Sequence, residues 1–387
     1  MWEITLPRTI AAGEGALEYL KSIEGKRALI VTGSIVKKMG FVDKVANYLK
    51  EMGMELEVIE VEPEPSVETV KRGVELAKTY GPDWIIGLGG GSNIDAAKAI
   101  WVLYERPDLE VASINPFIKL GMRKKARLIC IPTTSGSGSE ASWATVITNI
   151  KEERKMELAN KELVPDMVIL DPTLPMSMPQ KLVAETGLDA LTHAIEAYVS
   201  PKRNDFSDAL AIKAIKTIFQ HLLRSYRNPE DKEAKEKMHN AATMAGMAFT
   251  NSEVGIVHAL GHMIGGVFHI SHGKLMAIIL PYAIEYNAKV ALERYIDIAK
   301  AVGIEAKTDG EALEKLIETI KEMRREFGEP ASLKEAGISP EDFENKLENL
   351  VKKVMSSVVL QGNPRALNAE EARKLLIYIY EGRKVDF

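Results

Sequence analysis

At 387 residues this chain is longer than one hydrophobic core usually supports, so we expect two domains. Its 46% hydrophobic and 27% charged residues are typical of a globular enzyme. A net charge of -5 without a concentrated basic stripe argues against a nucleic-acid partner.

Targeting signals and membrane segments are not evident. The first fifteen residues lack a basic region followed by an apolar core, and no uninterrupted run reaches the roughly 18 apolar residues of a membrane span. The single cysteine, Cys130, lies in an apolar run, which predicts a buried strand thiol and excludes an internal disulfide. We expect a cytoplasmic enzyme with no membrane partner. The scarcity of glutamine beside many Glu and Lys residues resembles thermophilic, heat-adapted proteins.

The first half of the chain alternates short apolar runs with amphipathic stretches. The predicted strands cover residues 27–32, 56–61, 84–88, 128–131 and 167–170, and the predicted helices cover residues 36–52, 67–80 and 94–103. Strand-helix alternation predicts a doubly wound parallel sheet.

After about residue 180 the pattern becomes helical. Apolar residues recur at helical spacing in segments such as 208–222 and 311–327, and almost nothing beyond Pro179 alternates like a strand. The sequence therefore predicts an α/β nucleotide-binding domain over residues 1–180 and an all-α domain over residues 181–387.

Histidines gather in the helical half. Four of the seven histidines lie within fifteen positions, and an aspartate-histidine pair lies upstream. Asp189 and His193 are four residues apart, as are His258 and His262. On a helix this spacing places each pair on one face about a turn apart, a separation that one ion bridges.

A third segment completes the expected metal site. His272 follows Gly265-Gly266, where we expect a break in the helix and a turn that returns the chain to the same point. One aspartate and three histidines would then form an oxygen and nitrogen site for a divalent transition metal. Fe(II), Zn(II), Co(II), Ni(II) and Mn(II) all suit these ligands, and no thiolate favours zinc.

A glycine cluster follows the third predicted strand and opens a helix. Gly89, Gly90 and Gly91 let the backbone approach a pyrophosphate closely, and the amides near Ser92 would point at its charge from the helix N-terminus. The spacing is neither G-x-G-x-x-G nor a Walker motif, so a plain tight turn is the alternative.

A second loop over residues 132–140, PTTSGSGSE, also follows a strand and concentrates hydroxyls and glycines. Open α/β sheets bind ligands at the carboxyl ends of their strands, where both loops are expected. Together the two loops favour a nucleotide site.

Four strings in the chain resemble one family. They are GGGSNIDAAK (89–98), PTTSGSGSE (132–140), GLDALTHAIEAYVS (187–200) and AGMAFTNSEVGIVHALGH (245–262), followed by His272-Gly273. In this order and at these spacings the sequence resembles the iron-containing, group III alcohol dehydrogenases, which are related in fold to dehydroquinate synthase and glycerol dehydrogenase. The resemblance covers nearly the whole chain and weakens after about residue 290.

The resemblance implies roles for individual residues. It implies metal ligation by Asp189, His193, His258 and His272, with His262 near the active site but not a ligand. It implies dinucleotide contacts at Gly90, Gly91, Ser92, Asp95, Thr133, Thr134, Ser137, Ser142 and Lys155. Phe249 falls near the nicotinamide end of the cleft.

Two positions depart from the family pattern. Where NAD-preferring members often carry Asp, which accepts a hydrogen bond from the ribose 2'-hydroxyl, this chain has Gly33, with Lys37 and Lys38 close by. Without a carboxylate to repel a 2'-phosphate, NADP(H) is preferred over NAD(H). The second departure is Glu64, where the family often has Asn, and a cofactor contact there is in doubt.

These observations predict an enzyme that transfers a hydride reversibly between NADP(H), or NAD(H), and a small alcohol or aldehyde. The alcohol oxygen would bind Fe(II), and Zn(II) is an expected substitute in purified protein. His262 would relay the alcohol proton towards solvent, with packing on its helix as the alternative. We also expect a homodimer.

Other interpretations stay open. Within redox chemistry, the alternative is a zinc-dependent polyol or glycerol dehydrogenase. Outside it, the alternatives are a metal hydrolase, a dehydroquinate-synthase-like lyase and a pure scaffold protein. His221 and His239 lie among polar residues and are predicted at the surface. Glu140 and Glu196 are either partners of the site residues or helix-surface carboxylates.

Overall fold

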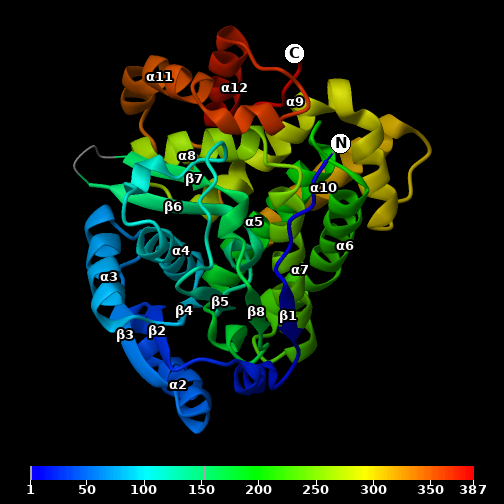
Figure 1. The fold of residues 1–387 in the computed structure, drawn as a ribbon. Coiled ribbons are helices and arrows are strands. Elements are labelled where there is room, and N and C mark those ends of the chain that lie inside the picture. The colour runs from blue at the N-terminus through cyan, green and yellow to red at the C-terminus, as the bar shows by residue number, and fades with distance from the viewer. Residues whose placement is uncertain (1, 151–153) are drawn as a thin grey trace. The chain divides into compact units, whose positions relative to one another are not determined.

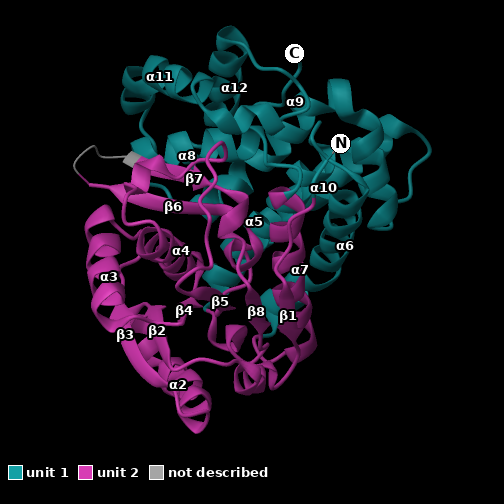
Figure 2. Ribbon diagram, in the orientation of Figure 1, with its two compact units in different colours: residues 1–3, 179–228, 251–387 teal, residues 4–178, 229–250 magenta. Residues whose placement is uncertain are grey.

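The computed structural model describes residues 2–150 and 154–387, which form two compact units (Figure 2). The α/β unit contains residues 4–178 and 229–250, and the helical unit contains residues 179–228 and 251–387 with the first residues of the chain. The two units are defined by their internal contacts, which do not show that either folds on its own. The division into domains over residues 1–180 and 181–387 therefore stays a prediction.

A six-stranded parallel sheet forms the centre of the α/β unit, in the order β1-β8-β5-β4-β2-β3 (Figure 1). The strands are β1 Thr9–Ala12, β2 Arg27–Thr32, β3 Glu55–Glu60, β4 Trp84–Gly89, β5 Arg127–Pro132 and β8 Met167–Leu170. From β3 the chain crosses back over β2 to β4, and then continues outward to β5 and β8. The predicted doubly wound α/β fold is confirmed.

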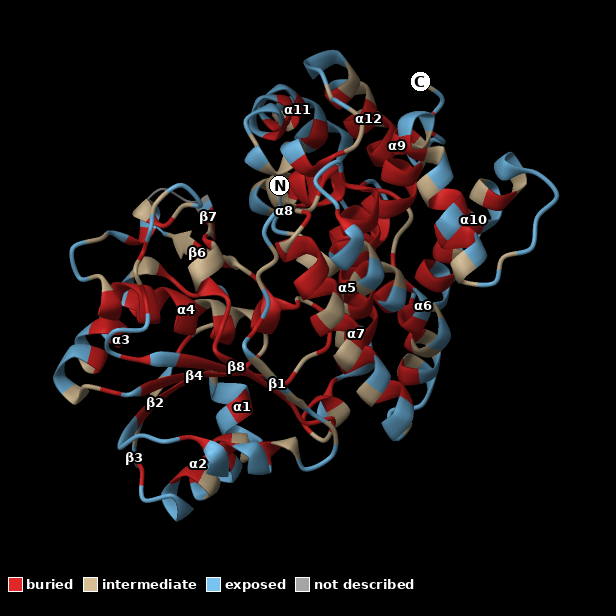
Figure 3. Ribbon diagram, turned by 45° about the vertical axis from the view of Figure 1, so that its right-hand side comes forward, coloured by how far each residue is buried: buried red, intermediate tan, exposed pale blue. Residues whose placement is uncertain are grey.

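Alternate residues along the strands feed two apolar layers, one on each face of the sheet. Leu29 and Val31 pack in one layer with α3 (Val67–Tyr80) and α4 (Gly91–Glu105). Ala28 and Ile30 pack in the other with the 3-10 helix η1 (Ala16–Ser22) and α2 (Phe41–Glu51). The inner strands β2, β4, β5 and β8 are therefore buried on both faces (Figure 3), as is typical of parallel sheets, whereas the edge strands β1 and β3 are partly exposed.

Some elements of the α/β unit differ from the prediction. The single helix predicted over 36–52 is two helices, α1 (Ser34–Lys38) and α2, because Gly40 adopts a left-handed φ of 78° between them. The edge strand β1 and the antiparallel hairpin β6 (Ala144–Asn149) and β7 (Arg154–Ala159) were not predicted. The remaining elements of this unit are α7 Lys232–Thr250, η2 Val111–Ser113, η3 Ser139–Ala141, η4 Lys161–Leu163 and η5 Pro175–Ser177.

The described part of the helical unit contains helices and no strands, which confirms the all-α prediction. Its elements are α5 Gln180–Val199, α6 Asp205–Arg227, α8 Ile256–Phe268, α9 His272–Ala301, α10 Asp309–Glu326, α11 Pro340–Met355, η6 Val358–Gly362 and α12 Ala369–Glu381. The break predicted at Gly265-Gly266 is wrong, because α8 runs through both glycines. The helix ends instead at His269, which takes a left-handed φ of 56°.

Helix α9 is apolar enough to cross a membrane by length and composition, with a mean hydropathy of 1.3 in its most apolar window. However, 78% of that window is buried inside the structure. Packing in the core of the helical unit accounts for its apolar residues.

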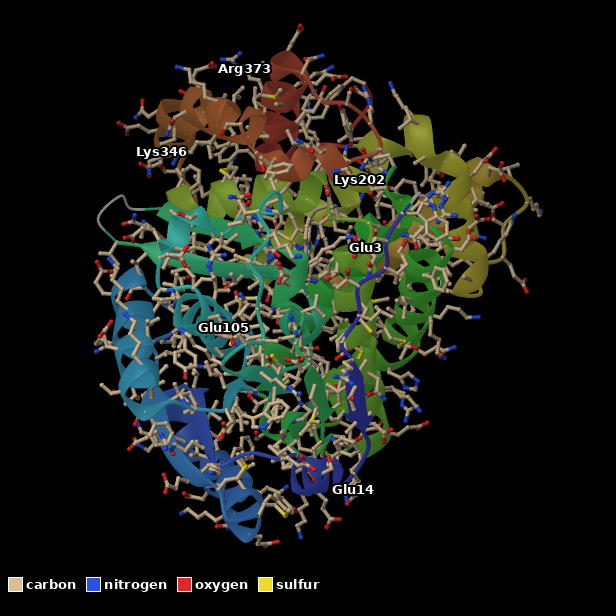
Figure 4. All side chains as sticks on the ribbon, viewed as in Figure 1. Glu3, Glu14, Glu105, Lys202, Lys346 and Arg373 are labelled. Atoms are coloured by element: carbon tan, nitrogen blue, oxygen red, sulfur yellow. The ribbon has the colours of Figure 1, made fainter. Side chains whose placement is uncertain are left out.

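Charged side chains lie mainly on the outside of each unit (Figure 4). Arg373 of α12, for example, is exposed and pairs with Glu348 of α11 at 2.7 Å. Glu105 at the end of α4 is a buried exception, since its carboxylate accepts hydrogen bonds from the backbone amides of Lys124, Lys125 and Ala126. These bonds satisfy the buried charge and hold the loop that leads into β5.

Candidate metal centre and dinucleotide-binding loops

Helix α5 carries the first two predicted metal ligands. Asp189 and His193 lie one turn apart on this helix, and both are buried. The Nδ1 atom of His193 lies 3.8 Å from Oδ1 of Asp189. The spacing argument from the sequence therefore holds in the structure for this pair.

Helix α8 and the start of α9 bring two further imidazoles to the same oxygen. His258 and His262 lie on α8, and His272 is the first residue of α9, after the left-handed turn at His269. From Oδ1 of Asp189, Nε2 of His272 is 3.3 Å away and Nε2 of His258 is 3.6 Å away. The three predicted imidazole ligands thus converge on one oxygen of the fourth predicted ligand, Asp189.

This set of donors fits a divalent metal. Asp189, His258 and His272 each offer a ligand atom, and these atoms all lie within 4.8 Å of one another. Oδ1 of Asp189 and Nε2 of His258 are buried and make no hydrogen bond of good geometry. A buried polar atom without a partner costs about 1–3 kcal/mol, and a metal ion bound here would satisfy both atoms.

The electrostatics of the site favour an anionic carboxylate and neutral rings, because burial lowers the pKa of both His193 and His272. Burial acts to raise the pKa of Asp189, but the neighbouring imidazoles of His193 and His272 hold that pKa well below its usual range. Burial lowers the pKa of His193 to about 3, against the attraction of Asp189. An ionised carboxylate and a neutral imidazole are the forms in which these groups bind a metal.

His258 differs because a second carboxylate contacts its ring. Oε2 of Glu196, on α5, lies 2.5 Å from Nδ1 of His258, and both residues are buried. Burial alone would lower the pKa of His258, but Glu196 and Asp189 raise it to about 9 in the metal-free protein. The sequence left open whether Glu196 contacts a site residue or lies on the helix surface. The structure shows that it is buried and contacts His258.

His262 lies beside this cluster. Its ring stacks on that of His272 with centroids 5.0 Å apart, and its edge approaches His258 at 5.7 Å. It is partly exposed, whereas Asp189 and His258 are buried. The side chain is thus next to the predicted ligands, on the more open part of the cluster.

In the α/β unit, the two predicted dinucleotide-binding loops lie side by side. Gly89, at the end of β4, pairs with Pro132, at the end of β5, and the Thr133 amide donates a hydrogen bond to the Gly89 carbonyl at 3.0 Å. A Cβ on Gly91 would come within 2.9 Å of Oγ of Ser137. The expectation that both loops lie at the carboxyl ends of parallel strands is confirmed, and the binding of a dinucleotide there stays a prediction.

Glycine is required at the end of β4. Gly89 has a φ of 142°, and a Cβ there would overlap the side chain of Asn93. Helix α4 begins at Gly91, so its first free amides face the carboxyl end of the sheet. A Cβ on Gly33, after β2, would also approach Asn93, at 2.9 Å. The ends of β2 and β4 therefore adjoin where the sheet order reverses.

Two predicted cofactor contacts, Asp95 and Ser142, form part of a buried network. The carboxylate of Asp95 accepts hydrogen bonds from Oγ of Ser139 at 2.5 Å and from the Val146 amide at 2.9 Å. Lys98 is fully buried and donates to the Ser142 carbonyl at 2.7 Å and to its Oγ at 3.2 Å. These bonds hold the segment after the second loop against α4.

Lys98 supports the second loop and was not among the residues predicted from the sequence. The sequence signal for it is a lysine within residues 96–104 of α4, where every other residue is apolar and buried. Burial lowers the pKa of Lys98, while the charge of Asp95 acts to raise it. An ionisable side chain in such a setting generally needs several partners.

Glu64, the position that departs from the family pattern, forms an ion pair with Lys155, which is a predicted cofactor-binding residue. Nζ of Lys155 lies 2.7 Å from Oε1 of Glu64. Glu64 has a left-handed φ of 61°, a conformation that Asn adopts more readily than Glu. Thr133 and Phe249 are buried in this unit, whereas Thr134 and Ser137 are partly exposed.

The surface prediction for His239 is wrong. This residue of α7 is 2% exposed, and its Nδ1 lies 3.0 Å from Oγ of Ser135 in the second loop. Its polar neighbours in the sequence misled the prediction, because one face of α7 is apolar and carries His239 inward. His221 is partly exposed. Glu140 is buried too, and accepts a hydrogen bond from Thr243 at 2.6 Å.

Comparisons with known proteins agree with this arrangement. The family model for iron-containing alcohol dehydrogenase matches residues 7–172, and that for the C-terminal part of the Fe-containing alcohol dehydrogenase family matches residues 183–380. The chain is 47% identical over 390 residues to an NADPH-dependent butanol dehydrogenase from Clostridium saccharobutylicum, covering 100% of both chains.

Other similar proteins include a longer relative and a solved structure. The chain is 38% identical to a bifunctional aldehyde-alcohol dehydrogenase of Escherichia coli K12, covering 98% of this chain but 46% of that protein. The structure of an iron-containing alcohol dehydrogenase from Thermococcus thioreducens is similar with a TM-score of 0.90 and 36% identity, covering 98% of this chain and 100% of that one.

The chain therefore belongs to the iron-containing alcohol dehydrogenase family, and it is an oxidoreductase of that family.

Proposed function

We propose that this protein is a metal-dependent alcohol dehydrogenase that interconverts small alcohols and aldehydes with NADP(H). The convergence of three imidazoles on Oδ1 of Asp189 carries the proposal. Family membership supports it, and the relative from C. saccharobutylicum is named for NADPH and butanol.

In this proposal, one set of residues binds the metal and another residue moves the alcohol proton. Asp189, His193, His258 and His272 would hold the metal, which when bound supplies Lewis acidity that lowers the pKa of an alcohol. The nicotinamide supplies the hydride chemistry. The anionic Asp189 would reduce the net charge of the site when a cation binds, and it is itself buried.

His262 is proposed to pass the alcohol proton towards solvent. Its stacking on His272 and its partial exposure support this role. We expect His262→Gln to lower kcat by about 100-fold, the range of general acid-base catalysis, with metal content unchanged. An unchanged kcat would leave His262 with a packing role.

Fe(II) is the proposed metal, because the family is the iron-containing one. Borderline nitrogen ligands and a hard carboxylate suit it, although zinc is an expected occupant of purified protein. NADP(H) is the proposed cofactor on two grounds, the absence of a carboxylate at Gly33 and the nearby lysines Lys37 and Lys38. Nζ of Lys37 lies 2.6 Å from Oε1 of Glu60, and this ion pair would have to break before Lys37 could bind a 2'-phosphate.

One experiment tests the proposal. Metal-stripped protein receives Fe(II) or Zn(II), and oxidation of NADPH and NADH is followed with short aldehydes. We expect turnover with NADPH and Fe(II), and none for Asp189→Asn, which removes the carboxylate charge at constant size. Absence of turnover with either cofactor and every metal would overturn the proposal. Activity restricted to glycerol and zinc would instead favour the polyol dehydrogenase.

A further inference from the structure

We propose that Glu196 is a positioning residue for the metal centre. Its carboxylate accepts a hydrogen bond from the Nδ1–H of His258 and so leaves the Nε2 lone pair of that ring for the metal. This inference rests on the proposed function, because it assumes that Asp189 and His258 bind a metal. None of the comparisons assigns a role to Glu196.

The carboxylate contacts two groups at the start of α8. Oε1 of Glu196 accepts a hydrogen bond from the Val257 amide at 2.6 Å, and Oε2 lies 2.5 Å from Nδ1 of His258. Glu196 is seven residues after Asp189 on α5, about two turns, so one helix face carries both carboxylates. Glu196 and His258 are 4% and 2% exposed, so water does not compete for these bonds.

These contacts determine which nitrogen of His258 carries the proton. A neutral imidazole has one N–H and one lone pair, and an ionised carboxylate only accepts hydrogen bonds. In the neutral ring, the form that binds a metal, the proton therefore lies on Nδ1, facing Glu196. Nε2, which is 3.6 Å from Oδ1 of Asp189, is left as the donor atom.

Glutamine would not replace this glutamate, although it has nearly the same shape. Both neighbours of the carboxylate, the Val257 amide and Nδ1 of His258, are hydrogen-bond donors. An amide has one accepting oxygen and one donating nitrogen. If its oxygen stays on Val257, its NH2 faces Nδ1 and selects the tautomer whose proton blocks Nε2. If the amide flips, its NH2 opposes the Val257 N–H.

A neighbouring side chain supplies a matched control. Oδ1 of Asn363 accepts a hydrogen bond from the Ile256 amide at 3.2 Å, at the same helix start, and none of its hydrogen bonds in the structure goes to His258. Asn363→Ala therefore loosens the start of α8 without changing the partner of the ring. A loss of metal caused only by a loosened helix would appear in both variants.

The test uses Co(II) as the metal probe. Metal-free wild type, Glu196→Gln, Glu196→Asp and Asn363→Ala are titrated with Co(II) against a competing chelator, and the Co(II) absorption spectrum and the thermal midpoint are recorded. We expect Glu196→Gln to weaken Co(II) binding by about 10–100-fold and to change the spectrum. Glu196→Asp keeps an acceptor on a shorter arm and is expected to lose less. Asn363→Ala is expected to lower the midpoint and to bind Co(II) normally.

Each outcome has a defined meaning. Equal binding by wild type and Glu196→Gln would overturn the role of Glu196 and leave the proposed function intact. Equal losses in Glu196→Gln and Asn363→Ala would also overturn it, in favour of a purely structural role. If wild type itself fails to bind Co(II), the metal site and this inference both fall. If Glu196→Gln does not fold, Glu196→Asp is compared with Asn363→Ala, and equal affinities would refute the proposal.

Discussion

Burial sets the charge of individual side chains in this protein. His239 is an example outside the metal centre, because α7 carries it into the interior against Ser135. Burial lowers its pKa to about 4, and the charge of Asp171 only partly opposes this. In the folded protein His239 is therefore neutral over a range in which the unfolded chain binds a proton.

The first prediction concerns the pH dependence of stability. Neutral His239 contributes fully to the free energy of unfolding above pH 6.5, the pKa of the unfolded residue. This contribution is lost as the pH falls towards about 4. The full loss corresponds to about 3 kcal/mol. We expect His239→Asn, which keeps a polar atom near Ser135 but does not titrate, to flatten this decline. Urea unfolding between pH 4 and 7.5 measures it, and parallel curves for the two proteins would contradict it.

The second prediction concerns Gly33 and cofactor choice. Gly33→Asp places a carboxylate where we propose that a 2'-phosphate binds, and like charges repel. We expect the ratio of kcat/KM for NADPH to that for NADH to fall by about 10–100-fold, or about 1.4–2.8 kcal/mol. Gly33→Ala is the control, because it adds the same Cβ beside Asn93 without the charge. A similar ratio in both variants would show that charge at this position does not select the cofactor.

At the scale of elements, close backbone contact joins α7 to the second loop. Gly246 of α7 lies against Gly138, so a Cβ on Gly246 would overlap the Gly138 carbonyl oxygen. Thr243, one turn earlier, donates a hydrogen bond from its hydroxyl to the Glu140 carboxylate of the same loop. Helix α7 thus holds the loop by a close backbone contact and by a buried hydrogen bond.

The third prediction tests this contact. Gly246→Ala should lower the free energy of unfolding by about 1–3 kcal/mol, the usual cost of overpacking, because neither backbone can move away freely. Gly310→Ala is the matched control, since a Cβ there meets nothing within 4 Å in α10, and it should stabilise by up to about 1 kcal/mol. Chemical denaturation compares them. Equal effects in the two variants would mean that the Gly138 contact relaxes without cost.

At the scale of the whole molecule, all four proposed metal ligands belong to the helical unit, and the proposed dinucleotide-binding loops belong to the α/β unit. Each unit has its own buried apolar residues. A metal that binds only the folded helical unit stabilises that unit by mass action.

The fourth prediction is therefore a metal-dependent unfolding transition. At a metal concentration about a thousandfold above the dissociation constant, binding contributes about 4 kcal/mol. We expect chelation to lower the midpoint of the transition that involves the helical unit by about 8–16 °C. Scanning calorimetry with and without chelator measures this shift. Asp189→Asn should respond little to the chelator, and an unchanged wild-type midpoint would argue against a metal in the folded protein.

Regular spacing made much of this protein predictable from its sequence. The parallel sheet, the helical second half and the pairing of Asp189 with His193 depend on periods of two to four residues, which are local properties of the chain. The edge strand β1 was missed because its four residues are too few to show a period, and pairing with β8 defines it.

Contacts between distant residues were decided by the tertiary structure alone. The sequence contained the spacing of the histidines but not the partner of His258, because Glu196 is 62 residues away. Only the folded unit, in which α5 and α8 both pack against α9, brings the two side chains together. Likewise, polar neighbours in the sequence concealed the burial of His239, and α8 continues through Gly265-Gly266 until the turn at His269. Local preferences determine which elements form, whereas the burial of apolar surface determines which of their polar side chains meet.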